Sequence, residues 1–309
     1  MSNDTIVERI IVGVDGSVPS RAAIRWSVER ARSHDTGVVL VHVMDDEWGA
    51  IGSQLIAEAN RGSVDMLDAG ARMVHELSPG MPITVELLYG SPMWELAQLS
   101  NETTLVVVGT HKTGFHYGRA FGSRSLQLAS LARGPIAVVP ESAVRLRRGV
   151  VVGIDDTTAG RNALAVAASE ADRAGSELTL VRALDTPAPD YLGEGGKRSW
   201  QEERDTHARR ELTDAVSRVQ ELHPRLATRS RIIRRPAGIA LNEVSRNAEL
   251  LVVGSSRRSG FEQANGLGSV AYDVLLNLVC PTMIVHSYVG ESTRPESPHP
   301  QEEHHEHAR

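Results

Sequence analysis

The chain has few of the features that mark a secreted, membrane-bound or nucleic-acid-binding protein. It contains a single cysteine, Cys280, in 309 residues, so an intrachain disulfide framework is excluded and a cytoplasmic location is expected. No run approaches the roughly 20 apolar residues of a membrane helix, and no signal peptide is expected at the N-terminus. The net charge is −6 without a concentrated basic face, so neither nucleic acid nor a membrane is expected as a partner. The lone cysteine lies in an apolar run and is predicted to be a core residue.

Arginine is concentrated in two short stretches, which we interpret as solvated surface. One stretch falls between two similar halves of the chain, and the other alternates with apolar residues along an expected strand. Anion binding is the alternative interpretation. The arginines concerned are Arg145, Arg147, Arg148, Arg229, Arg231, Arg234 and Arg235.

What the chain does have is one long internal repeat. The sequence Val-Gly-Val-Asp at 12–15 returns as Val-Gly-Ile-Asp at 152–155, and Gly-Ser at 122–123 returns at 268–269. A repeat of this length exceeds the roughly 20–50 residues of a solenoid unit and fits whole domains. We therefore predict one domain at 1–141, a second at 149–288, and a disordered tail rich in His, Glu and Pro at 289–309.

Each half alternates short apolar runs with helical patterns. The runs are almost continuously apolar, which is typical of strands buried on both faces of a parallel sheet. The expected fold class is therefore α/β, with two tandem doubly wound domains, each with a five-stranded parallel sheet flanked by helices. In the first half the expected strands are 10–14, 38–43, 83–88, 105–108 and 136–139, and the expected helices are 19–33, 54–77, 92–100 and one that starts at 123.

A glycine-rich segment follows the fourth expected strand of the first half. Gly109, Gly114 and Gly122 would permit positive φ angles and close approach of a ligand to the backbone. The helix that opens at Ser123 would present free N–H groups and a favourable dipole to an anion. Together they predict a phosphate cradle; the alternative is that Gly122 and Ser123 only cap a helix.

Asp15 stands at the end of the first expected strand. Ligands of doubly wound sheets bind at the carboxyl ends of the strands, and a carboxylate there can accept a hydrogen bond from the amino group of a base. The alternative is that Asp15 caps the helix that begins near Pro19. Neither a P-loop nor a dinucleotide-binding glycine motif is present. No catalytic constellation is suggested by His42, His111 or His116, so the protein is not expected to be an enzyme.

These features together resemble the tandem-domain universal stress proteins. The resemblance is carried by Val-Gly-Val-Asp-Gly-Ser at 12–17, Leu-Val-His-Val at 40–43, the glycine loop, and the apolar strand after Pro135. It covers about 280 residues, both repeats included, and implies the strand order 3-2-1-4-5. It also implies that the last strands of the halves, 136–139 and 283–285, pair as an internal pseudo-dimer. A symmetric homodimer of the whole chain is a further expectation.

The ATP-binding branch of this family has the loop pattern G-x2-G-x9-G-[ST], from which the first half departs once. Lys112 stands at the second glycine, where it would reach a phosphate or fill its space, and Gly114 would supply flexibility. The second half departs further, because Arg257 replaces that glycine and Ala183 stands where the first half has Val43. The residues implied for nucleotide binding are Asp15, Val43, Gly109, Lys112, Gly114, Gly122, Ser123 and Ser125, with Asp155, Gly254, Gly268 and Ser269 as the weaker second set.

The function implied by the resemblance is that of a regulatory adenine-nucleotide-binding protein of the stress response. Its ligand would be ATP, with Mg²⁺ as a candidate companion ion, slow or no hydrolysis, and an unidentified regulatory protein as partner. A ligand-free interaction or scaffold module with degenerate loops is the alternative. A third hypothesis, an adenine-nucleotide hydrolase, is disfavoured because a Ser-Gly-Gly-x-Asp-Ser type loop is absent.

Overall fold

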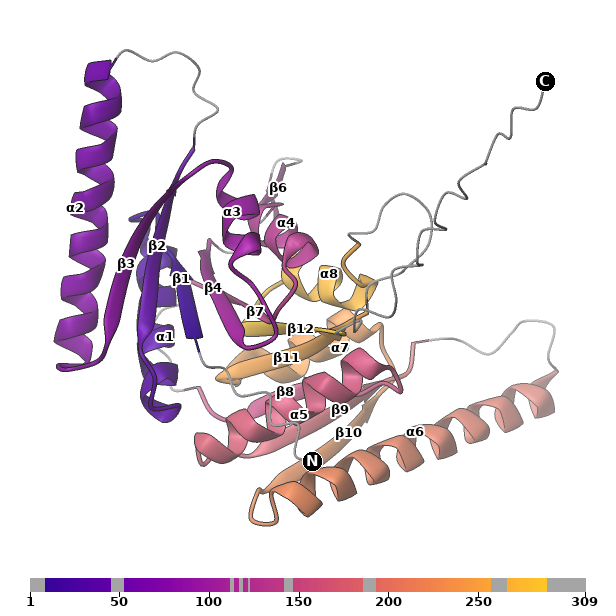
Figure 1. Cartoon of the computed structure of the whole chain (residues 1–309). Coiled ribbons are helices and arrows are strands. Elements are labelled where there is room, and N and C mark those ends of the chain that lie inside the picture. The colour runs from indigo at the N-terminus through magenta and orange to yellow at the C-terminus, as the bar shows by residue number, and fades with distance from the viewer. Residues whose placement is uncertain are drawn as a thin grey trace, which may run out of the picture.

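A single ten-stranded sheet runs through the computed structural model from one half of the chain to the other (Figure 1). Its strand order is β10-β9-β8-β11-β12-β7-β4-β1-β2-β3. The structure describes residues 9–45, 53–111, 114–116, 119–121, 123–141, 147–185, 193–256 and 266–287. The predicted tail at 289–309 lies outside these residues.

The first half contains five parallel strands in the predicted order 3-2-1-4-5. Its strands agree with the expected ones to within two residues at each end. They are β1 (Arg9–Gly13), β2 (Val38–Met44), β3 (Ile83–Tyr89), β4 (Thr104–Thr110) and β7 (Ile136–Pro140). Its helices are α1 (Val18–Ser33), α2 (Ser53–Leu77), α3 (Pro92–Gln98) and α4 (Ser123–Leu131).

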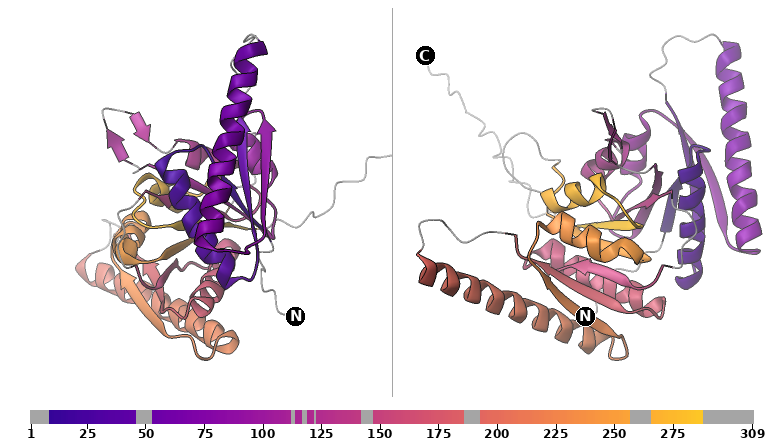
Figure 2. Two further views of the ribbon diagram at one scale, coloured as in Figure 1. Left: turned by 90° about the vertical axis from the view of Figure 1, so that its left-hand side faces the viewer. Right: turned by 180° about the vertical axis from the view of Figure 1, so that it is seen from behind.

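The second half repeats this arrangement. Its strands β10-β9-β8-β11-β12 again read 3-2-1-4-5 when they are counted within the half. They are β8 (Val150–Gly153), β9 (Leu178–Ala183), β10 (Thr228–Ile233), β11 (Leu250–Ser255) and β12 (Thr282–His286). The helices are α5 (Thr158–Arg173), α6 (Glu194–Leu222), α7 (Ala237–Val244), the 3-10 helix η1 (Ser245–Asn247) and α8 (Ser269–Leu276). The long helices α2 and α6 lie at opposite ends of the sheet (Figure 2).

A small hairpin, not expected from the sequence, stands in the glycine segment of the first half. Its strands β5 (Gly114–His116) and β6 (Arg119–Phe121) pair antiparallel, apart from the main sheet. Three-residue strands are too short to show an alternating pattern in the sequence. Part of the expected loop thus forms a two-stranded ribbon that precedes α4.

The two halves are joined by their last strands, as expected. Strands β7 and β12 pair antiparallel, with Ala137 opposite Met283, whereas all other neighbours in the large sheet are parallel. Every residue of both strands is buried. The pairing removes two exposed sheet edges, which would otherwise offer unpaired N–H and C=O groups to other chains.

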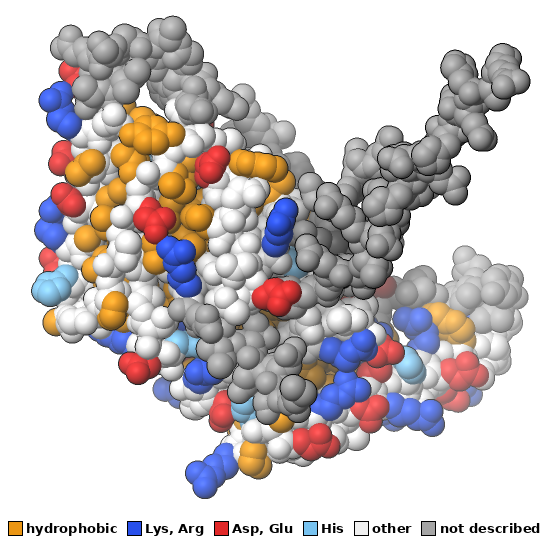
Figure 3. Space-filling model, viewed as in Figure 1, with side chains coloured by type: hydrophobic (Ala, Val, Ile, Leu, Met, Phe, Trp, Pro, Cys, Tyr) orange, Lys and Arg blue, Asp and Glu red, His pale blue; other side chains and the backbone are white. Residues whose placement is uncertain are grey.

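Each face of the sheet has its own hydrophobic core, and each core runs through both halves. The strands send alternate side chains to opposite faces, so Ile10 lies in one core and Ile11 in the other. Helices α1, α2, α5 and α6 cover the first face, and α3, α4, α7 and α8 cover the second. Cys280 is fully buried in the second core, as predicted. Ile83, Val85 and Tyr89 of β3 and Trp94 of α3 are exposed apolar side chains. Figure 3 shows apolar side chains gathered on one face of the first half.

The interpretation of the arginine stretches as solvated surface is wrong for Arg147. Its guanidinium donates from Nη1 to the carbonyl of Ala248 at 3.2 Å and from Nη2 to that of Val279 at 3.1 Å. Both carbonyls lie in segments that lead into a strand, and neither has a partner in the described sheet. Arg147 satisfies these carbonyls and so holds the start of the second half against the segments before β11 and β12. The second stretch is on the surface, where Arg229 pairs with Glu177 at 3.2 Å. Arg145 lies outside the described residues.

Three charged or titratable side chains are buried together between α1 and α5. Arg30 contacts Glu170, and His34 Nε2 lies 3.1 Å from the other carboxylate oxygen of Glu170. Burial, with the positive charges of Arg30 and Arg173, lowers the pKa of His34 from 6.5 to about 3. The imidazole is therefore neutral and donates from Nε2 to the carboxylate.

This lowered pKa predicts an acid-sensitive fold. A group whose pKa is lower in the folded state stabilises the protein above its unfolded pKa and loses that contribution as the pH falls. Between pH 6.5 and about 4, wild type should lose more free energy of unfolding than His34→Gln, which keeps a donor but cannot be protonated. Urea denaturation of both proteins across this range is the measurement, and equal losses would contradict the assignment.

Candidate functional site

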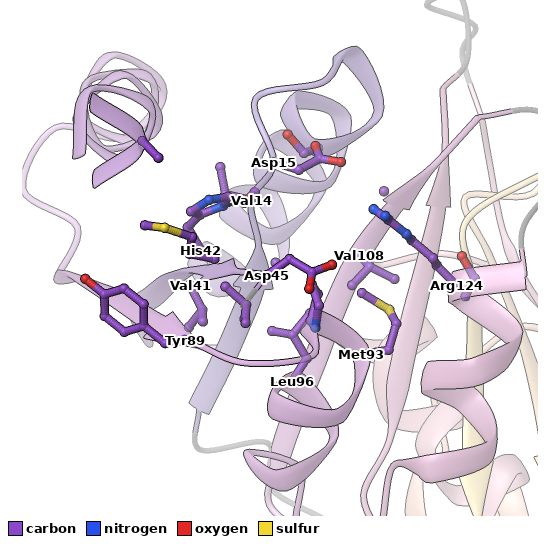
Figure 4. A pocket seen from close by; sticks show the side chains of 18 of the residues that line it. Val14, Asp15, Val41, His42, Asp45, Tyr89, Met93, Leu96, Val108 and Arg124 are labelled. Atoms are coloured by element: carbon purple, nitrogen blue, oxygen red, sulfur yellow. Dashed lines mark hydrogen bonds between the residues drawn. The ribbon is translucent and has the colours of Figure 1, made fainter. Parts of the chain in front are cut away.

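A cavity of about 1100 Å³ opens at the carboxyl ends of the strands in the first half. The ends of β1, β2 and β4 form its floor, and α2, α3 and α4 contribute its walls (Figure 4). Strand order reverses between β1 and β4, and ligands of doubly wound sheets bind at such a reversal. The cavity is lined by Gly13, Val14, Asp15, Ser20, Val41, His42, Val43, Met44, Asp45, Glu58, Ala59, Tyr89, Pro92, Met93, Leu96, Val108, Gly109, Arg124 and Ser125.

Four of the residues predicted for nucleotide binding meet in this cavity. Asp15 follows β1, Val43 lies in β2, Gly109 lies in β4, and Ser125 is buried in the first turn of α4. Gly114 begins β5, and Ser123 is the first residue of α4. Lys112, Gly122 and the side chain of Ser123 lie outside the described part of the chain.

Asp15 does not cap α1, so the structural alternative for this residue is wrong. The cap is Ser17, whose hydroxyl accepts from the N–H of Ser20 at 3.2 Å. Asp15 Oδ1 accepts from the N–H of Ser17 at 3.0 Å. Burial raises the pKa of Asp15, but hydrogen bonds from Ser17 and Ser20 and the charge of Arg124 outweigh it, so the pKa is lowered. Asp15 therefore presents an ionised carboxylate to the cavity.

Gly109 is required for packing and not for its backbone angles. A Cβ at this position would lie 2.2 Å from the backbone C and O of Pro19, where α1 crosses β4. The freedom of glycine to adopt a positive φ is not used at this position, because Gly109 is not among the positive-φ glycines of the described chain. The equivalent Gly254 meets Ala159 in the same way, at 2.6 Å. The repeated glycine thus lets the first helix of each half start directly above the fourth strand.

The sequence did not identify Arg124 as a site residue. It is the second residue of α4, is exposed, and points from the α4 wall toward the cavity (Figure 4). Its position beside the predicted Ser123 and Ser125 was the available signal, but which face of α4 turns to the cavity depends on the packing of the helix. Arg124 places a guanidinium at the helix N-terminus, where backbone N–H groups also favour an anion.

His42 and Tyr89 form the opposite end of the cavity (Figure 4). His42 Nδ1 lies 2.6 Å from the carbonyl oxygen of Val14. Since a carbonyl only accepts, Nδ1 carries the proton, and in the neutral ring Nε2 is left as an acceptor. The Tyr89 hydroxyl donates to Asn60 Oδ1 at 3.1 Å, which links the end of β3 to α2 beside the cavity.

The cavity has an apolar centre, and its walls carry side chains of both charges. Val41, Val43, Met93, Leu96 and Val108 supply apolar surface. Among the described residues of the lining, Asp15, Asp45 and Glu58 supply carboxylates, and Arg124 supplies a guanidinium. The apolar side chains can pack against a flat ring, the carboxylates can accept from hydrogen-bond donors, and Arg124 can bind an anionic group.

The equivalent polar groups of the second half contact one another. Asp155 Oδ1 accepts from both the N–H and the hydroxyl of Thr157, at 3.1 and 2.7 Å. Arg182, at the position of His42, binds Glu211 at 2.6 Å.

The start of α8 is also engaged within the second half. The N–H of Gly268 donates to Ser255 Oγ at 3.1 Å. Gly268 is the cap of α8 and Ser269 is its first residue. Val270 and Ala271 stand where the first half has Arg124 and Ser125. Arg257 lies outside the described residues.

A metal cluster and a membrane-spanning helix each have requirements that can be compared with the described residues. In this part of the chain no cluster of three or more His, Cys, Asp or Glu side chains is arranged to hold a metal ion. None of the described helices is both long and apolar enough to span a bilayer.

Comparison with known proteins finds the same family in both halves of the chain. A model of the universal stress protein family matches residues 7–140 and again residues 147–286. A universal stress protein of Mycolicibacterium smegmatis is 29% identical over 288 residues, covering 89% of this chain and 96% of that protein. One of Mycobacterium tuberculosis is 28% identical over 304 residues, covering 89% and 94%. The crystal structure of a universal stress protein from Archaeoglobus fulgidus has a TM-score of 0.64 at 14% identity, covering 91% of this chain and 97% of that one.

Proposed function

Because the chain belongs to the universal stress protein family, we propose that it binds ATP in the cavity of its first half and acts as a regulatory binding protein, not as an enzyme. The supporting observation is the gathering of Asp15, Val43, Gly109 and Ser125 at one cavity. It lies at the point where strand order reverses, and Arg124 stands at its α4 wall. The proposed domain boundaries are those predicted, 1–141 and 149–288.

In the proposed complex the adenine lies over the floor of the cavity, among Val41, Val43 and Val108. Its amino group donates to the Asp15 carboxylate, which the lowered pKa keeps ionised. The phosphates extend toward the N-terminus of α4, where Arg124 and Ser125 receive them. Gly114, Gly122, Ser123 and Lys112 complete the phosphate end in this proposal, and any Mg²⁺ arrives bound to the phosphates of ATP.

We further propose that the second half serves as a nucleotide-free partner of the first. Its candidate residues Asp155, Gly254, Gly268 and Ser269 correspond in position to the first set, but Val270 stands where the first half has Arg124. A phosphate at the start of α8 would therefore lack a guanidinium, and it would compete with Ser255 for the N–H of Gly268.

The proposal is tested by native mass spectrometry of the freshly purified full chain, followed by calorimetric titration with ATP. One nucleotide per chain is the expected stoichiometry. If the protein carries no nucleotide and binds neither ATP nor adenosine, the alternative becomes the better account: a ligand-free interaction or scaffold module.

A substitution of Arg124 can distinguish binding of the phosphates from binding of the base. We predict that Arg124→Val, which introduces the residue of the second half, weakens ATP binding about tenfold to hundredfold by removing a charge-assisted contact. Adenosine affinity should stay the same. Arg133→Val, an exposed position just after α4 and away from the cavity, is the control. Equal loss of ATP and adenosine binding by calorimetry would show that Arg124 shapes the cavity and does not hold phosphate.

A further inference from the structure

The two halves meet around a pseudo-two-fold axis that can be located in the strand register. Strands β7 and β12 are equivalent at a spacing of 146 residues, as Pro135 and Pro281 show. In the pairing, Ala137 lies opposite its own equivalent, Met283, while Ile136 and Val138 lie opposite Ile284 and Thr282. The axis therefore passes between Ala137 and Met283, and residues close to it face their own equivalents.

At this axis a small side chain faces a large one. Ala137 and Met283 are both fully buried and belong to the core on the α1 and α5 face. Two first halves paired in the same way would place Ala137 against Ala137 and leave a void. Two second halves would place Met283 against Met283 and overfill the same space. Either change destabilises a packed core.

On the same face a positive side chain meets a negative one at equivalent positions. Arg30 in α1 and Glu170 in α5 are separated by 140 residues, the spacing of the repeat in this region. Their side chains are 4% and 11% exposed and contact each other. The guanidinium also lies 5.8 Å from the ring centroid of Trp26. Within the described residues Arg30 Nε and Nη2 have no hydrogen-bond partner, so Glu170 supplies the compensation for this buried charge.

A pairing of like halves would bring like charges together in this place. Two copies of the first half would bury Arg30 against Arg30, and two copies of the second half would bury Glu170 against Glu170. A buried charge that lacks its partner is strongly destabilising. Charge and volume therefore each disfavour a pair of two first halves or of two second halves. Both favour the pair of one first half with one second half.

We infer that this interface is built for unlike halves: the partner that fits the first half is the second half of this protein, and copies of the same half are rejected. A single-domain protein that pairs with itself must satisfy its axis with identical residues. Here the two halves carry different residues at equivalent positions near the axis. The first half has Ala137 and Arg30, and the second half has Met283 and Glu170. The selection does not depend on the nucleotide site.

The first test uses the folded full chain with a protease site inserted between residues 141 and 147. After cleavage, native mass spectrometry should detect a complex of one first half with one second half. When isotopically labelled and unlabelled cleaved proteins are mixed, any exchange should yield only unlike pairs. Complexes of two first halves or of two second halves would overturn the inference, as would release of both halves as monomers.

The second test measures the charge pair in the uncut chain. Arg30→Glu and Glu170→Arg should each lower the melting temperature by roughly 10 °C, because each buries two like charges. The double variant R30E/E170R should recover most of the loss. A double variant no more stable than the single ones would show that the two positions are not coupled across the axis.

An exchange of the small and the large side chain at the axis provides a second test if the charge variants do not fold. Ala137→Met should overfill the axis, Met283→Ala should leave a void, and A137M/M283A should restore a melting temperature close to wild type. Additive losses in this cycle would overturn the complementarity in volume.

Discussion

Gly109→Ala should lower the melting temperature by about 5–10 °C, as expected for overpacking against backbone that cannot yield. The added Cβ would lie 2.2 Å from the backbone C and O of Pro19 and 2.6 Å from the N of Ser20. Neither side can relax easily: β4 is an inner strand held by β1 and β7, and Pro19 lies in the first turn of α1. Thermal unfolding followed by circular dichroism is the measurement.

Two other glycines provide the controls. At Gly62, in the middle of α2, nothing lies within 4 Å of an added Cβ, so Gly62→Ala should stabilise the helix by about 0.5–1 kcal/mol. Gly254→Ala should destabilise the protein, because Gly254 meets Ala159 as Gly109 meets Pro19. If Gly109→Ala behaved like Gly62→Ala, close packing would not be the reason for glycine at this position.

Ala59→Trp should abolish ATP binding while leaving the fold intact. Ala59 is an exposed residue of α2 that lines the cavity, so an indole introduced there can occupy the space of the ligand without disturbing a core. We expect at least about a hundredfold loss of affinity, corresponding to roughly 2.7 kcal/mol. Calorimetric titration with ATP and adenosine is the measurement, and both ligands should be affected.

Arg61→Trp is the matched control for this substitution. Arg61 is also exposed on α2 but does not line the cavity, so the variant carries the same side chain on the same helix and should bind ATP like wild type. Unchanged binding in Ala59→Trp would place the nucleotide outside this cavity and leave the proposed site without support.

The sequence predicted the fold well because its strands are buried on both faces. Runs such as Leu-Val-Val-Val at 105–108 are typical of strands inside a parallel sheet, and the repeat supplied every element twice. The joining of β7 to β12 followed from the family resemblance. The hairpin of β5 and β6 escaped prediction because three-residue strands carry no periodic signal. Arg147 was misinterpreted because the carbonyls that it binds, at Ala248 and Val279, are distant in sequence.

For the candidate site, the sequence predicted several residues that the structure brings to one cavity, but it did not predict all of their contacts. Asp15 and Gly109 stand at strand ends, which topology alone directs to one edge of the sheet. The packing role of Gly109 was not predicted, because the sequence does not show that α1 crosses directly above it. Arg124 was missed because the direction of a side chain on a short helix is set by tertiary packing. Val43 and Ser125 were placed by the resemblance, and the structure brings both to the cavity.

The antiparallel joint of β7 and β12 also bears on the synthesis of the protein. A ribosome completes the first half well before β12 emerges, and during that interval the β7 edge, with its five buried-type side chains, is unpaired. Such an edge is the kind of surface to which chaperones and other nascent chains attach. The interval in which the first half waits for its partner strand is therefore the period of greatest risk of aggregation in the life of this chain.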